Sequence, residues 1–203
     1  MSVPLVVCDL DRTLIYSRAA LGDAPPPVRC VEVYDGAEAS FLTEVAFTLL
    51  TRLRMLSVFV PTTTRTVAQL RRVRLPEPAS RWAIAANGGH ILDRGVSDED
   101  WNAAVCARLE RECAPLGEVR AWFAAQADAP WLLRAREADD LFCYAIVDRA
   151  LLSADVLSGL AGWAAERGWT VSLQGRKLYV VPTPLTKSAA AAEVAVRAGA
   201  TCT

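Results

Sequence analysis

The amino-acid sequence predicts an α/β protein with a parallel sheet at its core and an α+β module inserted into that core. Apolar, strand-like runs alternate with helical patterns over residues 1–94. After about residue 95 the pattern changes to helices that precede pairs of strands. An Ala-rich helical pattern at the end belongs back with the core. We therefore expect a core of residues 1–94 and 183–203 and an inserted domain of residues 95–182.

The core elements follow in order from their hydrophobic patterns. Buried strands are expected at residues 4–10, 57–63 and 81–92, the last of which turns at Asn87-Gly88-Gly89, and helices at 40–56, 66–75 and 185–200. The segment 23–36 contains three prolines and one arm of a hairpin that ends at Asp35-Gly36. Ser40 is the expected N-cap of the first helix. That helix should bury a face made of Leu42, Val45, Ala46, Leu49 and Leu53.

The inserted module shows helical and strand patterns in turn. One or two helices are expected within residues 97–127, and a third at 153–168, where Gly168 ends it. Two hairpins complete the module: residues 131–137 with 141–148, around Ala138-Asp139-Asp140, and residues 169–174 with 177–183, across Gly175. The order helix, two strands, helix, two strands predicts an α+β domain.

Composition and charge narrow the class of protein. The chain has 203 residues, of which 53% are hydrophobic and 22% charged, as is typical of a soluble globular protein. A net charge of −1 indicates neither a nucleic acid nor a membrane as partner. We see no signal peptide and no apolar run long enough to span a membrane. The scattered cysteines suggest reduced, mostly buried thiols in a cytoplasmic protein: Cys8, Cys30, Cys106, Cys113, Cys143 and Cys202.

Polar groups gather where the predicted core strands end. Asp9 and Asp11 follow the first strand, and Thr62-Thr63-Thr64 follow the second. Lys187 lies in the first turn of the last helix, where the helix dipole disfavours a cation unless an anion faces it. Ligands of an open parallel sheet bind beyond the carboxyl ends of its strands. Carboxylates for a hard cation, hydroxyl donors and a lysine are the parts needed to hold a phosphoryl group.

These motifs resemble those of the haloacid dehalogenase-like hydrolase superfamily. The stretch "DLDRTL" is similar to the family's first signature, Asp-x-Asp-x-Thr, and "VFVPTTTRT" to its second. "IAANGGHIL" resembles the segment before a large C2-type cap, and "LTKSAAA" the third signature. The resemblance implies a Rossmann-like catalytic core with a C2-type cap. Within the superfamily, the layout is closest to the sucrose-phosphatase-like and mannosyl-3-phosphoglycerate-phosphatase-like branch.

The resemblance also implies roles for particular residues. Asp9 would be the nucleophile and a Mg²⁺ ligand, and Asp11 the general acid and base, with its main-chain carbonyl on the metal. Thr63 and Lys187 would hold the phosphoryl oxygens. The implied function is Mg²⁺-dependent hydrolysis of a small phosphorylated metabolite, most plausibly a sugar phosphate, through an aspartyl-phosphate. Further residues expected to contact the substrate are Arg12, Thr64, Arg65, Asn87, Gly88, Arg176 and Lys177.

Two departures from the family pattern stand out. Arg12 occupies a position where the family commonly has glycine. The family's fourth signature, an acidic pair after a further core strand, does not occur before Thr203. This predicts that the 203 residues form an incomplete core with weak metal binding, and with apolar surface uncovered near Val194 and Val196.

Other functions use similar residues. A phosphoacceptor signalling domain needs an aspartate at the end of its third strand, and "IAANGG" has none. A glycosyltransferase could use Asp-x-Asp to bind a metal and a nucleotide-sugar, but that leaves Thr63 and Lys187 unexplained. A sugar phosphomutase shares the aspartyl-phosphate chemistry and stays open as an alternative. So does a non-catalytic protein that binds a phosphorylated ligand.

Overall fold

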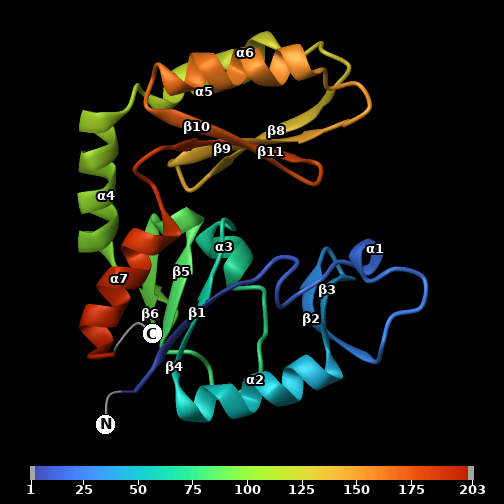
Figure 1. The fold of residues 1–203 in the computed structure, drawn as a ribbon, viewed down its shortest axis with the longest axis vertical. Coiled ribbons are helices and arrows are strands. Elements are labelled where there is room, and N and C mark those ends of the chain that lie inside the picture. The colour runs from blue at the N-terminus through green and yellow to red at the C-terminus, as the bar shows by residue number, and fades with distance from the viewer. Residues whose placement is uncertain (1–2, 201–203) are drawn as a thin grey trace. The chain divides into compact units, whose positions relative to one another are not determined.

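The computed structural model describes residues 3–200, which fold into two compact units. The first unit contains the chain up to Asn102 and again from Lys187, and the second contains Ala103–Thr186. Figure 1 shows the elements of both units along the chain. The predicted inserted domain spans residues 95–182, so the observed boundaries fall eight residues later at its start and four residues later at its end.

The first unit is built on a five-stranded sheet with the order β1-β4-β5-β6-β7. β1 (Leu5–Asp9), β4 (Val58–Thr62) and β5 (Trp82–Ala85) are parallel, as predicted. β6 (His90–Asp93) and β7 (Val96–Ser97) are antiparallel additions, so the sheet is mixed. The reason is the short 3₁₀ turn η1 (Ala86–Gly88), which reverses the chain directly after β5. A connection this short joins antiparallel strands, whereas parallel strands need a long crossover.

A two-stranded hairpin lies between the first and second parallel strands of the chain. The short helix α1 (Arg18–Leu21) precedes β2 (Val28–Tyr34), which pairs antiparallel with β3 (Ala37–Thr43). The turn consists of Asp35 and Gly36, with φ values of 50° and 75°. Two residues with positive φ match the twist of a tight hairpin. The predicted hairpin arm ending at Asp35-Gly36 is therefore confirmed.

The helix that follows differs from its prediction. β3 extends to Thr43, so α2 (Glu44–Leu56) begins later, and Thr43 instead of Ser40 is its N-cap, accepting the Ala46 N–H at 3.1 Å. The predicted buried face is wrong for Val45 and Leu49, which are 69% and 58% exposed, whereas Leu42 is buried and Ala46 packs against the core. Leu50, which was not predicted, is buried instead.

The next helix is shorter than predicted. α3 spans Val67–Leu70, and Thr66 and Gln69 form a capping box at its start. The Arg74 N–H donates to the Val31 carbonyl of β2 at 2.7 Å and does not continue the helix. The chain after α3 therefore hydrogen-bonds to β2 of the hairpin instead of extending the helix.

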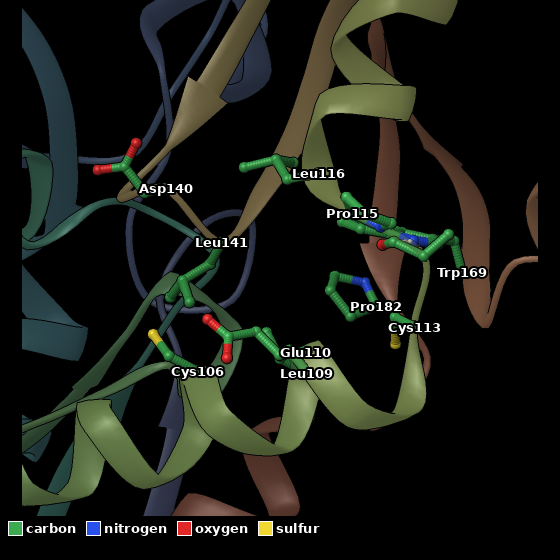
Figure 2. A pocket seen from close by; sticks show the side chains of 11 residues that line it. Cys106, Leu109, Glu110, Cys113, Pro115, Leu116, Asp140, Leu141, Trp169 and Pro182 are labelled. Atoms are coloured by element: carbon green, nitrogen blue, oxygen red, sulfur yellow. Dashed lines mark hydrogen bonds between the residues drawn. The ribbon is translucent and has the colours of Figure 1, made fainter.

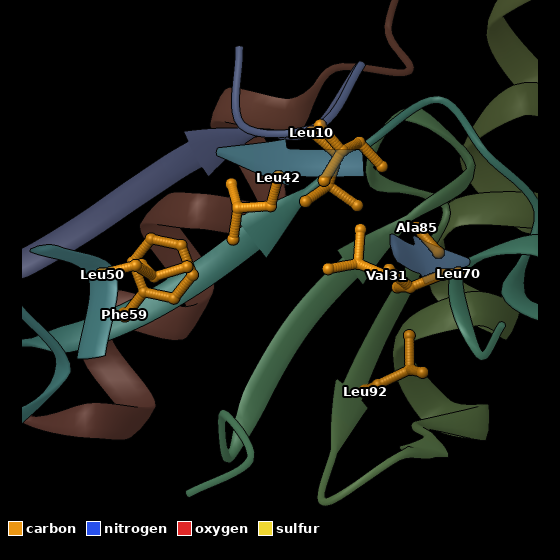
Figure 3. Close-up of a cluster of buried hydrophobic side chains, with 9 residues drawn as sticks. Leu10, Val31, Leu42, Leu50, Phe59, Leu70, Ala85 and Leu92 are labelled. Atoms are coloured by element: carbon orange, nitrogen blue, oxygen red, sulfur yellow. The ribbon is translucent and has the colours of Figure 1, made fainter. Parts of the chain in front are cut away.

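The sheet of the first unit has a hydrophobic cluster on each face. Neighbouring residues of one strand serve opposite clusters: Phe59 belongs to the first and Val60 to the second. Figure 3 shows the first cluster, formed with the hairpin, α2 and α3: Leu10, Ile15, Val31, Leu42, Leu50, Phe59, Leu70, Ala85 and Leu92. α7 (Lys187–Ala198) packs against the second cluster. Val194 is 0% exposed there, against expectation, whereas Val196 is 78% exposed.

The second unit is an α+β domain with a four-stranded antiparallel sheet in the order β10-β11-β9-β8. α4 (Glu99–Glu112) leads into it from the first unit. The remaining elements are α5 (Leu116–Ala125), β8 (Leu132–Ala138), β9 (Phe142–Val147), α6 (Ala154–Ala165), β10 (Trp169–Gln174) and β11 (Lys177–Pro182). Both predicted hairpins are present, and α5 and α6 lie together on one face of this sheet (Figure 1).

No helix within residues 3–200 is both long enough and apolar enough to cross a membrane. The five cysteines of this range are all free thiols. Cys143 is buried, and desolvation raises the pKa of its thiol to about 11. The other four are only half-buried, so the prediction of mostly buried thiols is wrong, and Cys202 lies outside the described residues.

Candidate active site

Asp9 lies at the carboxyl end of β1, opposite Thr62 of β4 in the parallel register. Lys187, the first residue of α7, donates from its ammonium group to Asp9 Oδ1 across 178 positions of sequence. The Thr13 hydroxyl lies 3.5 Å from Asp9 Oδ2. The side chains of Asp9 and Lys187 are 41% and 31% exposed, so a ligand can reach both. The structure therefore brings two of the predicted catalytic residues into direct contact.

A tight turn carries the chain from Asp9 past Asp11. The Leu10 carbonyl accepts the N–H groups of Thr13, Leu14 and Ile15 at 3.2, 2.9 and 2.9 Å. Leu10 and Ile15 are buried and anchor the two ends of the turn. Arg12 has φ = 62°, a conformation that glycine adopts readily and other residues adopt at a cost. A glycine at this position would avoid that cost, whereas this chain places an arginine side chain there.

Arg65 holds the Asp11 carboxylate from the end of β4. Its Nε donates to Oδ2 at 2.9 Å and its Nη2 to Oδ1 at 2.8 Å. This two-pronged geometry is the strongest form of arginine–carboxylate pairing. The Arg65 N–H donates to the Thr63 hydroxyl at 3.1 Å, and Thr63 itself is 1% exposed. Thr64 follows Thr63 directly and is partly buried. The second signature therefore positions the Asp11 carboxylate.

The Asn87-Gly88 segment lies at the carboxyl end of β5. The Asn87 N–H donates to the Thr63 carbonyl at 3.0 Å, which ties this turn to the second signature. The Gly88 carbonyl accepts the Trp101 Nε1–H at 2.9 Å. Asn87 and Gly88 have φ values of 58° and 103°. The segment thus links the site to the start of α4, and its contact with substrate stays a prediction.

Glu32 and the role of Ser40 were not predicted from the sequence. Glu32, in β2, is 5% exposed, and its Oε2 accepts Arg65 Nη1 at 2.8 Å and the Ser40 hydroxyl at 2.6 Å. Burial opposes ionisation of Glu32, but the hydrogen bonds from Ser40 and Arg65 outweigh it and lower its pKa. For Arg65, burial is likewise outweighed by Asp11 and Glu32, which raise its pKa. The only sequence signal was a charged residue between valines in a strand pattern.

Arg176 and Lys177 belong to the second unit, at the turn between β10 and β11. The Arg176 carbonyl accepts the Val147 N–H at 2.9 Å. The Lys177 ammonium lies 5.9 Å from the centre of the Tyr144 ring. Their predicted contact with substrate therefore remains a proposal.

A cavity of about 330 Å³ lies within the second unit, and Figure 2 shows its lining. Trp169 and Pro182 form an apolar wall with Cys113 beside them, and Cys106 of α4 lines the other side. Burial raises the pKa of both thiols, which favours the protonated form. Neither Arg176 nor Lys177 lines this cavity.

The donor atoms at Asp9 and Asp11 suit a magnesium ion. Within residues 3–200, no group of three or more His, Cys, Asp or Glu side chains is arranged to hold a metal. Asp9 offers a partly exposed carboxylate, and Asp11 adds a main-chain carbonyl two positions later. Mg²⁺ commonly binds through only one or two carboxylates and completes its shell with water and substrate phosphate. The hard oxygen donors present therefore fit Mg²⁺ completed by substrate and solvent.

Comparison with known proteins places the fold. The sequence matches no protein-family model and no curated protein. The structure is similar to the sucrose-phosphatase from Synechocystis in complex with sucrose and phosphate, with a TM-score of 0.60, 16% identity and coverage of 99% of this chain and 72% of that one. It is also similar to a haloacid dehalogenase-like hydrolase from Bacteroides thetaiotaomicron, with a TM-score of 0.58, 15% identity and coverage of 98% and 78%.

A third similar structure is the N-terminally truncated, IMP-bound IMP-nucleotidase from Plasmodium falciparum. Its TM-score is 0.56 at 9% identity, and the match covers 98% of this chain and 56% of that one. The chain therefore has the haloacid dehalogenase-like fold that its signatures predict, and the sucrose-phosphatase-like layout is consistent with it.

Proposed function

We propose that this haloacid dehalogenase-like fold carries a phosphatase that acts through an aspartyl-phosphate on Asp9. The observation that supports it most is the Asp9–Lys187 contact at the start of α7. A carboxylate with an accessible oxygen lies where a lysine and a helix N-terminus can both face an anion. Asp11, held by Arg65, follows two residues later.

The proposed reaction has two steps. In the first, an Asp9 carboxylate oxygen attacks phosphorus, the bond from phosphorus to the ester oxygen breaks, and Asp11 gives its proton to the departing alcohol. In the second, Asp11 takes a proton from a water molecule whose oxygen attacks phosphorus. The bond from phosphorus to the Asp9 oxygen breaks, which restores the Asp9 carboxylate and releases inorganic phosphate. Lys187 and the Thr63 hydroxyl would offset the negative charge on the phosphoryl oxygens.

Asp9 and the main-chain carbonyl of Asp11 would hold Mg²⁺ in this proposal. When bound, the ion neutralises phosphoryl charge in the way that metal ions do in other phosphoryl-transfer sites. The residues of the chain bind the phosphoryl group, orient it against Asp9 and hold the proton at Asp11.

The proposed substrate is a small phosphorylated metabolite of the sugar-phosphate class. One structure of similar fold is a sucrose-phosphatase solved with sucrose and phosphate, which supports this class of substrate. We further propose that the second unit acts as a cap that selects the substrate. Its contacts, together with those of the core, would come from Arg12, Thr64, Arg65, Asn87, Gly88, Arg176 and Lys177.

The test is phosphate release from a panel of phosphorylated metabolites in the presence of Mg²⁺, with Asp9→Asn as the decisive variant. Because an amide cannot attack phosphorus, turnover should fall more than about 100-fold, which is the lower end of what one acid–base group contributes. Asp93→Asn is the matched control, since Asp93 pairs with Arg81 at the surface. If Asp9→Asn keeps more than about 1% of the parent's rate, the covalent mechanism is wrong.

A further inference from the structure

An irregular register in the hairpin turns Glu32 toward the core. Cys30 pairs with Phe41, and Glu32 pairs with Ser40, so Val31 is an extra residue on β2. In a regular strand, neighbouring side chains point to opposite faces. Here Val31 and Glu32 are 3% and 5% exposed, so both are buried. Bulges of this kind re-aim side chains and are common beside active sites.

The buried Glu32 carboxylate is an anchor with three donors. Its Oε2 accepts the Ser40 hydroxyl at 2.6 Å and Arg65 Nη1 at 2.8 Å. Its Oε1 accepts Arg72 Nε at 3.3 Å. A charged group buried this completely persists only where opposite charges and hydrogen bonds satisfy it.

Arg65 is consequently held through all three nitrogen atoms of its guanidinium group. Nη1 is bound to Glu32, whereas Nε and Nη2 are bound to the two oxygens of Asp11. Its main-chain N–H is bound to the Thr63 hydroxyl. The Arg65 side chain is 11% exposed and that of Asp11 is 41% exposed. The orientation of the partly exposed Asp11 carboxylate is therefore set by the Arg65 guanidinium group. That group is held in turn by Glu32 of the β2–β3 hairpin.

We propose that Glu32 is a positioning residue: together with Ser40 it fixes Arg65, and Arg65 holds the Asp11 carboxylate where proton transfer requires it. This inference rests on the proposed phosphatase function and adds the β2–β3 hairpin to the parts of the molecule that set its rate. Small displacements of a catalytic group lower the rate strongly, by about 100-fold for about 1 Å, while affecting binding of the substrate less.

Arg72 supplies the matched comparison. It shares the Glu32 carboxylate, and its guanidinium lies 4.5 Å from the centre of the Tyr34 ring. These two contacts of Arg72 are with Glu32 and Tyr34, and neither involves Asp11. Arg72→Met therefore removes one of the two arginines bound to Glu32 and leaves the Arg65–Asp11 pair in place.

The experiment compares the parent with Glu32→Gln, Ser40→Ala and Arg72→Met. The activity readout is kcat and KM for p-nitrophenyl phosphate with Mg²⁺. The second readout, independent of activity, is the Arg65 Nε–H resonance in ¹⁵N-arginine-labelled protein, assigned with Arg65→Lys. We expect Glu32→Gln to lower kcat about 10- to 100-fold, to change KM less than about threefold, and to weaken the resonance by faster exchange with water.

Ser40→Ala keeps the Glu32 charge and removes only the hydroxyl donor. It replaces Glu32→Gln as the test variant if Glu32→Gln does not fold. It should lower kcat less than Glu32→Gln and shift the same resonance. Arg72→Met removes only the 3.3 Å bond to Glu32 Oε1, so it should change kcat and the resonance less than Glu32→Gln does. The inference is overturned if Glu32→Gln or Ser40→Ala loses thermal stability but keeps kcat and the Arg65 signal. A parent without turnover would instead contradict the proposed phosphatase, and the resonance would still decide whether Glu32 positions Arg65.

Discussion

At the scale of single residues, Lys187 occupies a position that its helix disfavours. A cation in the first turn of a helix costs about 0.3–1 kcal/mol, and here the pair with Asp9 offsets that cost. Both partners are partly exposed, so the pair itself contributes little to stability. The placement therefore supports the proposed role of Lys187 in binding the phosphoryl group.

We predict that Lys187→Met raises KM for a phosphorylated substrate and lowers kcat, each by about tenfold, because the phosphoryl group loses one charged hydrogen-bond donor. The free energy of unfolding should change by less than about 1 kcal/mol. Steady-state kinetics and urea unfolding measure the two effects, with Arg111→Met as a surface control. Unchanged kinetics in Lys187→Met would remove the lysine from the proposed site.

Glu32 should make stability depend on pH. Its folded-state pKa lies below the ordinary value of 4.5, after burial is outweighed by Ser40 and Arg65. A carboxyl group with a lowered folded-state pKa stabilises the protein fully above its unfolded pKa, and that contribution is lost as the pH falls through the folded-state pKa. The free energy of unfolding of the parent should therefore fall as the pH drops below about 4.5. The free energy of unfolding of Glu32→Gln should fall less over the same pH range. Urea unfolding from pH 7 to pH 3 decides this, and equal slopes for both proteins would contradict it.

At the scale of elements, Asp98 joins the start of α4 to α7. Its Oδ1 accepts the Trp101 N–H at 2.8 Å, which caps the helix, and its Oδ2 accepts from Arg197 of α7. The capping bond and the charge of Arg197 together lower the pKa of Asp98. One side chain thus fixes the point where the chain leaves the first unit.

We expect Asp98→Ala to lower the free energy of unfolding by about 1–2 kcal/mol, because an N-cap acceptor is lost. Asp98→Asn should lose less, since the amide oxygen still caps the helix and only the charge opposite Arg197 is removed. Urea unfolding of the three proteins provides the measurement. Should the two variants prove equally stable, the cap would not be the source of the stabilisation.

At the scale of the whole molecule, the proposed catalytic groups all lie in the first unit, and the proposed cap is the second. A cap that closes over a site excludes water and contributes binding groups. Arg176→Glu should therefore raise KM for the true substrate by more than about fivefold, because a charge that attracts the phosphate becomes one that repels it. Stability should change little, because the charge lies at a hairpin turn.

Arg149→Glu is the control for Arg176→Glu, since Arg149 is an exposed residue of the same unit with no proposed role. KM and the midpoint of thermal unfolding are measured for both variants. If Arg149→Glu raises KM as much as Arg176→Glu does, the rise is a general effect of charge. The proposed role of Arg176 would then be wrong.

The sequence by itself determined the features that depend on local pattern. Apolar runs placed β1 and β4, and Asp35-Gly36 placed the hairpin turn through its positive φ values. The resemblance of the residues around Asp9 to a known signature implied the fold, and the structural comparison agrees with it. Lys187 was predicted from its conflict with the helix dipole, and the structure brings it to Asp9.

Only the tertiary structure decided the features that depend on pairing. The helix pattern of α2 allowed more than one apolar face, and packing in the folded chain buries Leu50 and leaves Val45 and Leu49 exposed. In a regular strand, the side chains of Val31 and Glu32 would point to opposite faces of β2. A bulge in the pairing of β2 with β3 buries both side chains instead. The register between two strands is set by contacts with the partner strand. The hydrophobic pattern of one segment therefore cannot predict it. For this reason Asp9 and Lys187 could be predicted from the sequence, whereas Glu32 and the Arg65–Asp11 pair became visible only in the folded chain.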